Sequence, residues 1–266
     1  MSGKVYGGNH YKQIINEIKT RLIRISVFIL IITVLFMTLS ISFIDFHSIQ
    51  IPIIYPNPID NISIQIISFM KLTLIPKNVI LIQVSPGQAF FAEINVSIIT
   101  SLIFSGPLIL KEVMSFLLPA LYKTERKILR YLLFSSAFLF LAGCSFSFFV
   151  VIPYTIDFLY KYGESIGATS FFDIDQFISF TMNFLIVFGV SFQIPLIMFG
   201  LNEITLVKLD FWEDNFKYIV IILIIFGAFI TPDGSGITMW FVVCPLLFLY
   251  LIGIIVIKIN SRGNKK

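Results

Sequence analysis

Long, almost uninterrupted apolar stretches are the feature that most limits what this chain can fold into. A helix needs about 20 apolar residues to cross a hydrocarbon layer of about 30 Å, and several such runs occur here without a charged residue. The 266 residues are 57% hydrophobic and 13% charged, whereas soluble domains are roughly 45–50% apolar and 25% charged. The sequence therefore predicts a polytopic membrane protein, because a membrane-spanning backbone must satisfy its own hydrogen bonds.

The apolar windows predict six transmembrane helices in one all-α membrane domain that covers residues 1–266. The expected helices span about residues 22–44, 90–110, 128–151, 176–200, 216–230 and 237–257. The fifth window is unusual, because its apolar part, Tyr218–Ile230, has 13 residues and would rise only about 20 Å. We therefore expect the last two helices to be short.

The distribution of Lys and Arg predicts the orientation. Six spans place both ends of the chain on one side of the membrane. All but three of the 19 Lys and Arg residues fall in segments on that side, the exceptions being Lys71, Lys77 and Lys161. Because basic residues concentrate in cytoplasmic segments, both termini are expected in the cytoplasm. A prokaryotic plasma membrane is the expected location, and an organellar membrane is the less favoured alternative.

Two long outer loops follow from this topology. The first covers residues 45–89 and contains Ile62–Ile75, where polar residues interrupt an apolar run. We interpret that segment as an interfacial or cap helix, because Lys71 would be costly inside the bilayer. The second loop covers residues 152–175 and is acidic. Neither loop is expected to form an independent domain.

Enzyme chemistry finds little support in the sequence. His10 and His47 are the only histidines, so a histidine-based metal site or a histidine-activated nucleophile has few residues to draw on. An intramembrane protease would rest on Gly234–Gly236 alone, without a histidine in any span or a zinc motif. A small-solute secondary transporter is the more serious alternative, but it predicts inverted repeats, and the two halves of the chain show no internal similarity.

Four short motifs together resemble the TatC family, the signal-peptide-binding core of the twin-arginine protein translocase. They are Asn16–Leu22, Ser85–Phe91, Leu118–Lys127 and Phe188–Pro195. Their order, spacing and topology match the family from about residue 11 to 258. The resemblance implies a non-enzymatic receptor for twin-arginine signal peptides that exports folded proteins using the proton motive force. It also implies TatA/TatB-type single-span partners and a homo-oligomeric receptor complex in the lipid bilayer, with no cofactor, metal ion or nucleic acid.

Two carboxylates are the main candidates for signal-peptide binding. From the residues alone, Glu125 would neutralise its basic loop, and Glu17 would form an exposed i,i+4 pair with Arg21. The resemblance implies instead that Glu17 and Glu125 hold the paired arginines of a signal. A guanidinium suits this role, since it offers a carboxylate two parallel hydrogen bonds. Phe116 and Pro119 would ordinarily be packing and turn residues, and the resemblance places both on the same docking surface.

The fourth predicted helix carries an intramembrane amide. Gln193 stands two residues before Pro195, and a polar side chain at such depth normally faces a cavity or another helix. A buried interhelical hydrogen bond and a contact with a partner subunit both remain open. The resemblance implies that Gln193, with Phe192, contacts the single-span partner. Because the family usually has Glu at this position, the amide removes a titratable group.

The remaining candidates lie in the outer segments. Ser85 and Pro86 are expected to form an interfacial turn, and the resemblance implies that this loop helps to close the outer side of a concave cavity. Gln88 and Asn95 replace the Glu and Lys that the family commonly has. In the last outer turn, Pro232 and Asp233 are expected to set turn geometry and to cap the sixth helix, in preference to contacting cargo.

Overall fold

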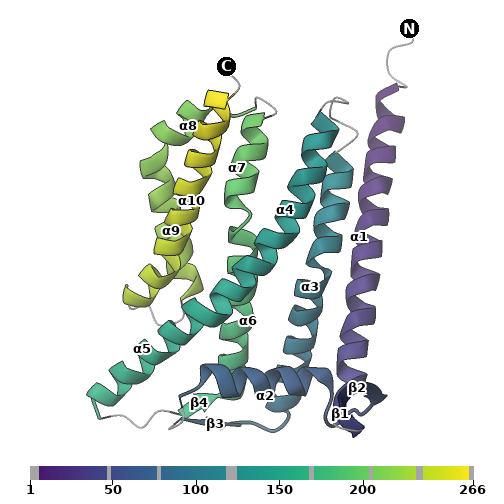
Figure 1. Cartoon of the computed structure of the whole chain (residues 1–266), viewed down its shortest axis with the longest axis vertical. Helices are drawn as coiled ribbons and strands as arrows, with labels where there is room; N and C mark the ends of the chain where they lie inside the picture. Colours follow the sequence, from purple (N-terminus) through teal and green to yellow (C-terminus); the bar gives the residue numbers. More distant parts are fainter. Residues whose placement is uncertain are drawn as a thin grey trace.

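The computed structural model shows a bundle of long helices with small elements laid across one end (Figure 1). It describes residues 6–46, 49–76, 79–117, 125–167, 171–203, 206–231 and 236–263. The first helix begins and the final helix ends at the opposite end of the bundle, where the second long helix also ends and the third begins (Figure 1).

Ten α-helices, four strands and one π-helical turn are assigned in the described ranges. The long helices are α1 (Tyr6–Thr38), α3 (Gln88–Leu117), α4 (Glu125–Phe146), α6 (Ile174–Ser191) and α10 (Ile237–Gly263). The shorter helices are α2 (Ile62–Leu74), α5 (Ile152–Ser165), α7 (Ile194–Glu203), α8 (Leu209–Asp214) and α9 (Phe216–Ile230). Strands β1 (Leu39–Phe46) and β2 (Ile49–Pro56) form an antiparallel pair, and β3 (Ile80–Ile82) and β4 (Phe171–Asp173) form a parallel pair.

Five described segments are long and apolar enough to cross a membrane. They are Ile15–Thr38, Gln88–Glu112, Phe134–Ser165, Ile174–Glu203 and Ile237–Ser261. Helix α9 is apolar from Tyr218 onward but has only 15 residues, a rise of about 22 Å against a hydrocarbon layer of about 30 Å. The chain is therefore a helical, polytopic membrane protein.

The structure corrects three expectations. Residues 39–44 are not the end of the first helix but part of β1, where Leu39–Phe43 alternates apolar and polar side chains with the period of a strand. The fold is therefore not all-α, since two small sheets are present. The final helix is not short, because α10 has 27 residues. The helix continues beyond the apolar run into polar residues up to Gly263. A hydropathy window detects only the apolar part and so underestimates the length of the helix.

Two of the long segments are interrupted near prolines. Between α4 and α5, Ser147–Val151 forms a π-helical turn in which the backbone N–H of Ile152 donates to the carbonyl of Ser147. Pro153 follows within the first turn of α5 and has no N–H to continue an α-helical ladder. Helix α6 ends at Ser191, and α7 resumes at Ile194, just before Pro195. Gln193 lies at this second break, between the two helices.

The core lies around α6, which packs against α3 and α4. Buried Phe184 and Phe188 of α6 meet Phe140 of α4 and Val96 of α3 within one cluster. Helix α7 packs instead against α10, and α1 packs mainly along α3. Helix α1 is thus the most peripheral of the five candidate spans, with 6% of its apolar window buried.

Candidate functional site

Four charged side chains from α1 and α3 meet near the end of the molecule where α1 begins. Arg21 donates from Nη2 to Glu17 Oε1 over 2.6 Å and from Nη1 to Glu112 Oε2 over 3.0 Å. Arg24 Nη1 donates to Glu112 Oε1 over 2.6 Å. The order Glu17–Arg21–Glu112–Arg24 alternates acid and base, and we call these four residues the ion-pair cluster. The i,i+4 contact expected between Glu17 and Arg21 is present.

The two carboxylates of the ion-pair cluster differ in exposure. The Glu112 side chain is 8% exposed and both of its oxygens accept from arginines. Its backbone carbonyl also accepts from Arg21 over 3.1 Å. The Glu17 side chain is 44% exposed, and exposed pairs on one helix contribute little because water screens them. Glu17 is therefore the carboxylate of the cluster that an external group can reach.

The other predicted signal-binding residues fall at the junction of α3 and α4. Phe116 lies in the last turn of α3 and Glu125 is the first residue of α4. Their side chains, and Pro119 as a whole, lie outside the described part of the structure. The last turn of α3 and the first turn of α4 nevertheless lie at the same end of the bundle as the start of α1 (Figure 1), where Glu112 on α3 contacts Arg21 on α1.

Gln193 forms a buried hydrogen-bonded link between helices. Its Oε1 accepts from Ser136 Oγ over 2.7 Å, and its Nε2 donates to the Ser136 carbonyl over 3.1 Å. Gln193 is 7% exposed, and Ser136 on α4 is buried. Beside it, the Phe192 ring lies 5.6 Å from that of Phe146. The interhelical alternative for Gln193 is thus realised within this chain.

We expect Gln193→Leu to lower the free energy of unfolding by about 1–3 kcal/mol, because Ser136 Oγ loses its partner in a dry environment. The measurement is thermal unfolding of purified protein in detergent. In the double variant Ser136→Ala/Gln193→Leu no hydroxyl is left unpaired, so part of the loss should be recovered. Equal loss in the single and double variants would contradict this explanation.

At the end of the bundle opposite the ion-pair cluster, Gln88 links the start of α3 to the start of α6. Its Nε2 donates to both oxygens of Asp173 over 2.7 Å, and its Oε1 accepts from the backbone N–H of Val84 over 2.9 Å. Asp173 also caps α6, and the N–H of Gln176, followed by the Gln88 amide, holds the pKa of this carboxyl below its ordinary value. Asp173 therefore carries its charge at neutral pH.

The turn of Ser85 and Pro86 is closed at Gly87, whose φ of +80° favours glycine. Ser85 contributes through its carbonyl, which accepts from the Gln88 N–H over 3.3 Å. Asn95, the second uncharged replacement, donates to Ser179 Oγ over 3.1 Å. Gln88 and Asn95 thus each bind a different partner near the start of α6. Pro232 and Asp233 lie outside the described residues.

Sequence reasoning missed two parts of the polar structure. Glu112 received no role, although it organises the ion-pair cluster. Glu93 also received none, and its Oε1 accepts from the buried Asn61 Nδ2 over 2.6 Å. Next to this pair, Ser63 Oγ and Ser97 Oγ lie 2.6 Å apart, so α2 is bound to α3 through two adjacent polar contacts. The signal in the sequence was the presence of Glu93 and Glu112 towards the two ends of the apolar segment Gln88–Glu112.

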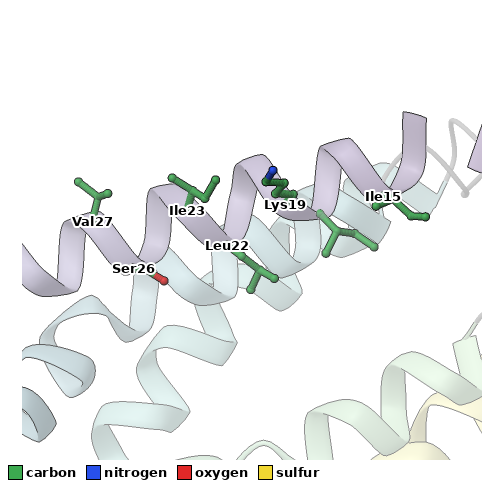
Figure 2. A pocket seen from close by; sticks show the side chains of 7 residues that line it. Ile15, Lys19, Leu22, Ile23, Ser26 and Val27 are labelled. Carbon is green, nitrogen blue, oxygen red and sulfur yellow. The ribbon is translucent and has the colours of Figure 1, made fainter. Parts of the chain in front are cut away.

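The described residues offer two apolar hollows but no metal site. One of about 680 Å³ lies between α4, α7 and α10 and is lined almost entirely by apolar side chains. The other, of about 430 Å³, follows the exposed face of α1, where Lys19 is the one charged lining residue (Figure 2). No three His, Cys, Asp or Glu side chains of the described ranges gather closely enough to hold a metal ion.

Comparison with known proteins places this architecture. The family described as Sec-independent protein translocase protein (TatC) matches residues 13–245. TatC of Cenarchaeum symbiosum is 44% identical over 210 residues, covering 79% of this chain and 80% of that protein. A chloroplastic TATC of Arabidopsis thaliana is 32% identical over 197 residues, covering 74% of this chain and 58% of that protein.

The solved structures agree with the sequence comparison. A crystal structure of the twin-arginine translocase receptor TatC superposes with a TM-score of 0.76 and 26% identity, covering 93% of this chain and 99% of that chain. The fold and the sequence thus define a helical membrane protein of the protein-translocase class. The chain belongs to the TatC family of Sec-independent protein translocases, which confirms the family expected from the four motifs.

Proposed function

We propose that this chain is the receptor subunit of a twin-arginine translocase and binds twin-arginine signal peptides through Glu17 and Glu125. The observation that carries the proposal is the exposed carboxylate of Glu17, located at the same end of the bundle as the α3–α4 junction where Glu125 begins α4 (Figure 1). Two carboxylates suit two arginines. Phe116 and Pro119 would complete the docking surface at this junction.

Recognition of arginine rests on the geometry of the guanidinium. Its planar fork can donate two parallel hydrogen bonds to one carboxylate, whereas lysine offers a compact point charge. Replacing both arginines of a signal with lysine therefore conserves charge but removes the second hydrogen bond at each carboxylate. Binding should be weakened without being converted to repulsion.

The proposed topology has six spans with both termini in the cytoplasm of a prokaryote. The five long apolar segments are joined by α9 as a short sixth span, which requires local thinning of the bilayer or shelter by a partner. Support for the orientation comes from the excess of Lys and Arg in the segments at the end where α1 starts and α10 stops. The proposed location is the plasma membrane.

Transport is proposed to require assembly. Six helices cannot enclose a pore wide enough for a folded protein, so the receptor would act with single-span TatA/TatB-type subunits and further copies of itself. Gln193 and Phe192, together with the exposed apolar face of α9, are the proposed contacts with the single-span partners, and Gln193 would have to exchange its hydrogen bonds with Ser136 to reach them. The proton motive force is the proposed energy source, and no enzymatic step is assigned to this chain.

The test is photo-crosslinking of a signal peptide that bears Arg-Arg, compared with its Lys-Lys twin, in membranes that contain the partner subunits. We expect strong Arg-dependent crosslinks to the wild-type chain and their loss in Glu125→Ala, because one arginine loses its carboxylate. Glu213→Ala is the matched control, since Glu213 is an exposed carboxylate and pairs with Lys258 over 3.1 Å. Equal labelling by both peptides, unaffected by Glu125→Ala, would overturn the receptor function.

A further inference from the structure

The proposed receptor site contains an internal competitor for its own ligand. Glu17, the exposed carboxylate assigned to a signal arginine, already accepts from Arg21 Nη2 over 2.6 Å and from Arg21 Nε over 3.2 Å. An incoming guanidinium must therefore share Glu17 with Arg21 or displace it. What becomes of Arg21 decides how readily Glu17 can bind a ligand.

Glu112 provides Arg21 with a second partner that the ligand does not need. Arg21 Nη1 lies 3.0 Å from Glu112 Oε2 and 3.1 Å from the Glu112 carbonyl oxygen. The Glu112 carboxylate is fixed in turn by Arg24 through its other oxygen, at 2.6 Å. Since the Glu112 side chain is 8% exposed and that of Glu17 is 44% exposed, the contact to Glu112 is the better shielded from water.

We propose that Glu112 is a positioning residue for guanidinium recognition, because it retains Arg21 on α3 and so allows Glu17 to turn to an arginine of the ligand. The inference rests on the proposed function and adds to it a specificity-determining residue at the same site. The ligand is a peptide with paired arginines. In the exchange Arg21 gives up its contact with Glu17 and keeps its contact with Glu112.

The proposal predicts that a substitution of Glu112 weakens binding, whereas a substitution of Arg21 does not. In Glu112→Gln, Arg21 loses its contacts with the Glu112 carboxylate and competes more strongly for Glu17, so the affinity for an Arg-Arg peptide should fall about fivefold, the scale of one exposed ion pair. In Arg21→Gln the competitor is absent, so the affinity should equal or exceed that of the wild type. The double variant Glu112→Gln/Arg21→Gln should recover the wild-type affinity to within about twofold.

The experiment is a fluorescence titration of labelled Arg-Arg and Lys-Lys peptides against the full chain in nanodiscs. Glu112→Gln/Lys19→Gln is the matched control. Lys19 is an exposed cation on α1, the helix that carries Arg21, and loss of positive charge alone should not restore binding. Recovery by Arg21→Gln but not by Lys19→Gln is the expected result. A purely structural role of Glu112 would not give this pattern.

Two outcomes would overturn the inference while leaving the receptor function intact. They are unchanged Arg-Arg affinity in Glu112→Gln, and weaker binding in Arg21→Gln with no recovery in the double variant. If Glu112→Gln does not fold, Arg21→Gln alone decides, since Arg24 still compensates Glu112 in that variant. If the wild-type chain binds both peptides equally, the proposed function itself fails, and the two failures are thereby distinguished.

Discussion

Replacing Gly143 with leucine is expected to prevent the chain from reaching a stable fold. A Cβ at Gly143 of α4 would lie 2.5 Å from the backbone oxygen of Phe188 and 2.8 Å from Cγ of Phe192. A backbone oxygen of α6 cannot move aside as a flexible side chain can, so the two helices would have to separate at the centre of the core. Overpacking of this kind costs about 1–3 kcal/mol for small additions and more for larger ones.

The measurement is thermal unfolding and size-exclusion chromatography in detergent for Gly143→Ala and Gly143→Leu. We expect a lowered midpoint for alanine and little or no monodisperse protein for leucine. Gly236→Ala is the matched control, because a Cβ there has no atom within 4 Å and alanine should leave stability unchanged. A leucine variant with the same unfolding midpoint as the wild type would show that α4 and α6 can separate without loss of stability.

Removing Asn61 is expected to release the cap helix α2 from the bundle. Asn61 is fully buried, and its Oδ1 accepts from the Ile64 N–H to cap α2. Its Nδ2 donates to Glu93 Oε1 over 2.6 Å and to the Met37 carbonyl over 3.0 Å. Asn61→Leu removes the N-cap hydrogen bond of α2, which lowers the free energy of unfolding by about 1 kcal/mol. It also leaves the Glu93 carboxylate without a donor, which lowers it by a further amount of about 1.5–3 kcal/mol.

The loss should therefore be about 2–4 kcal/mol and should appear as faster amide hydrogen exchange in α2. Asn61→Ser separates the two contributions, because a serine hydroxyl can still cap the helix but cannot replace the amide donor. We expect the serine variant to lie between the wild type and leucine. Hydrogen exchange in α2 that stays at the wild-type rate in Asn61→Leu would argue against this role.

The membrane class and the family could be predicted because both depend on local sequence. A long apolar run predicts a transmembrane helix whatever its tertiary contacts are. The four motifs are likewise read directly, and family membership confirms them. The role of Glu17 in binding remains a prediction, although its contact with Arg21 follows from helical spacing alone.

The features that were missed depend on partners far away in sequence or on alternations hidden inside an apolar window. Glu112 acquires its place from Arg21, which lies 91 residues earlier in the chain. Asn61 and Glu93 are 32 residues apart and belong to different helices. Strand β1 was hidden because Leu39–Phe46 is apolar enough to extend the preceding helical window, although Leu39–Phe43 has the period of a strand.

The parallel pairing of β3 with β4 has a consequence for the order in which the protein is assembled. Ile80 pairs with Phe171 and Ile82 with Asp173, so the ladder joins segments that leave the ribosome about 90 residues apart. It cannot form until α3, α4 and α5 have been threaded and residues 171–173 have arrived beside β3. During synthesis, β3 must therefore wait for its partner strand until β4 has been made. Formation of the β3–β4 sheet is therefore expected to be a late step in the folding of this chain.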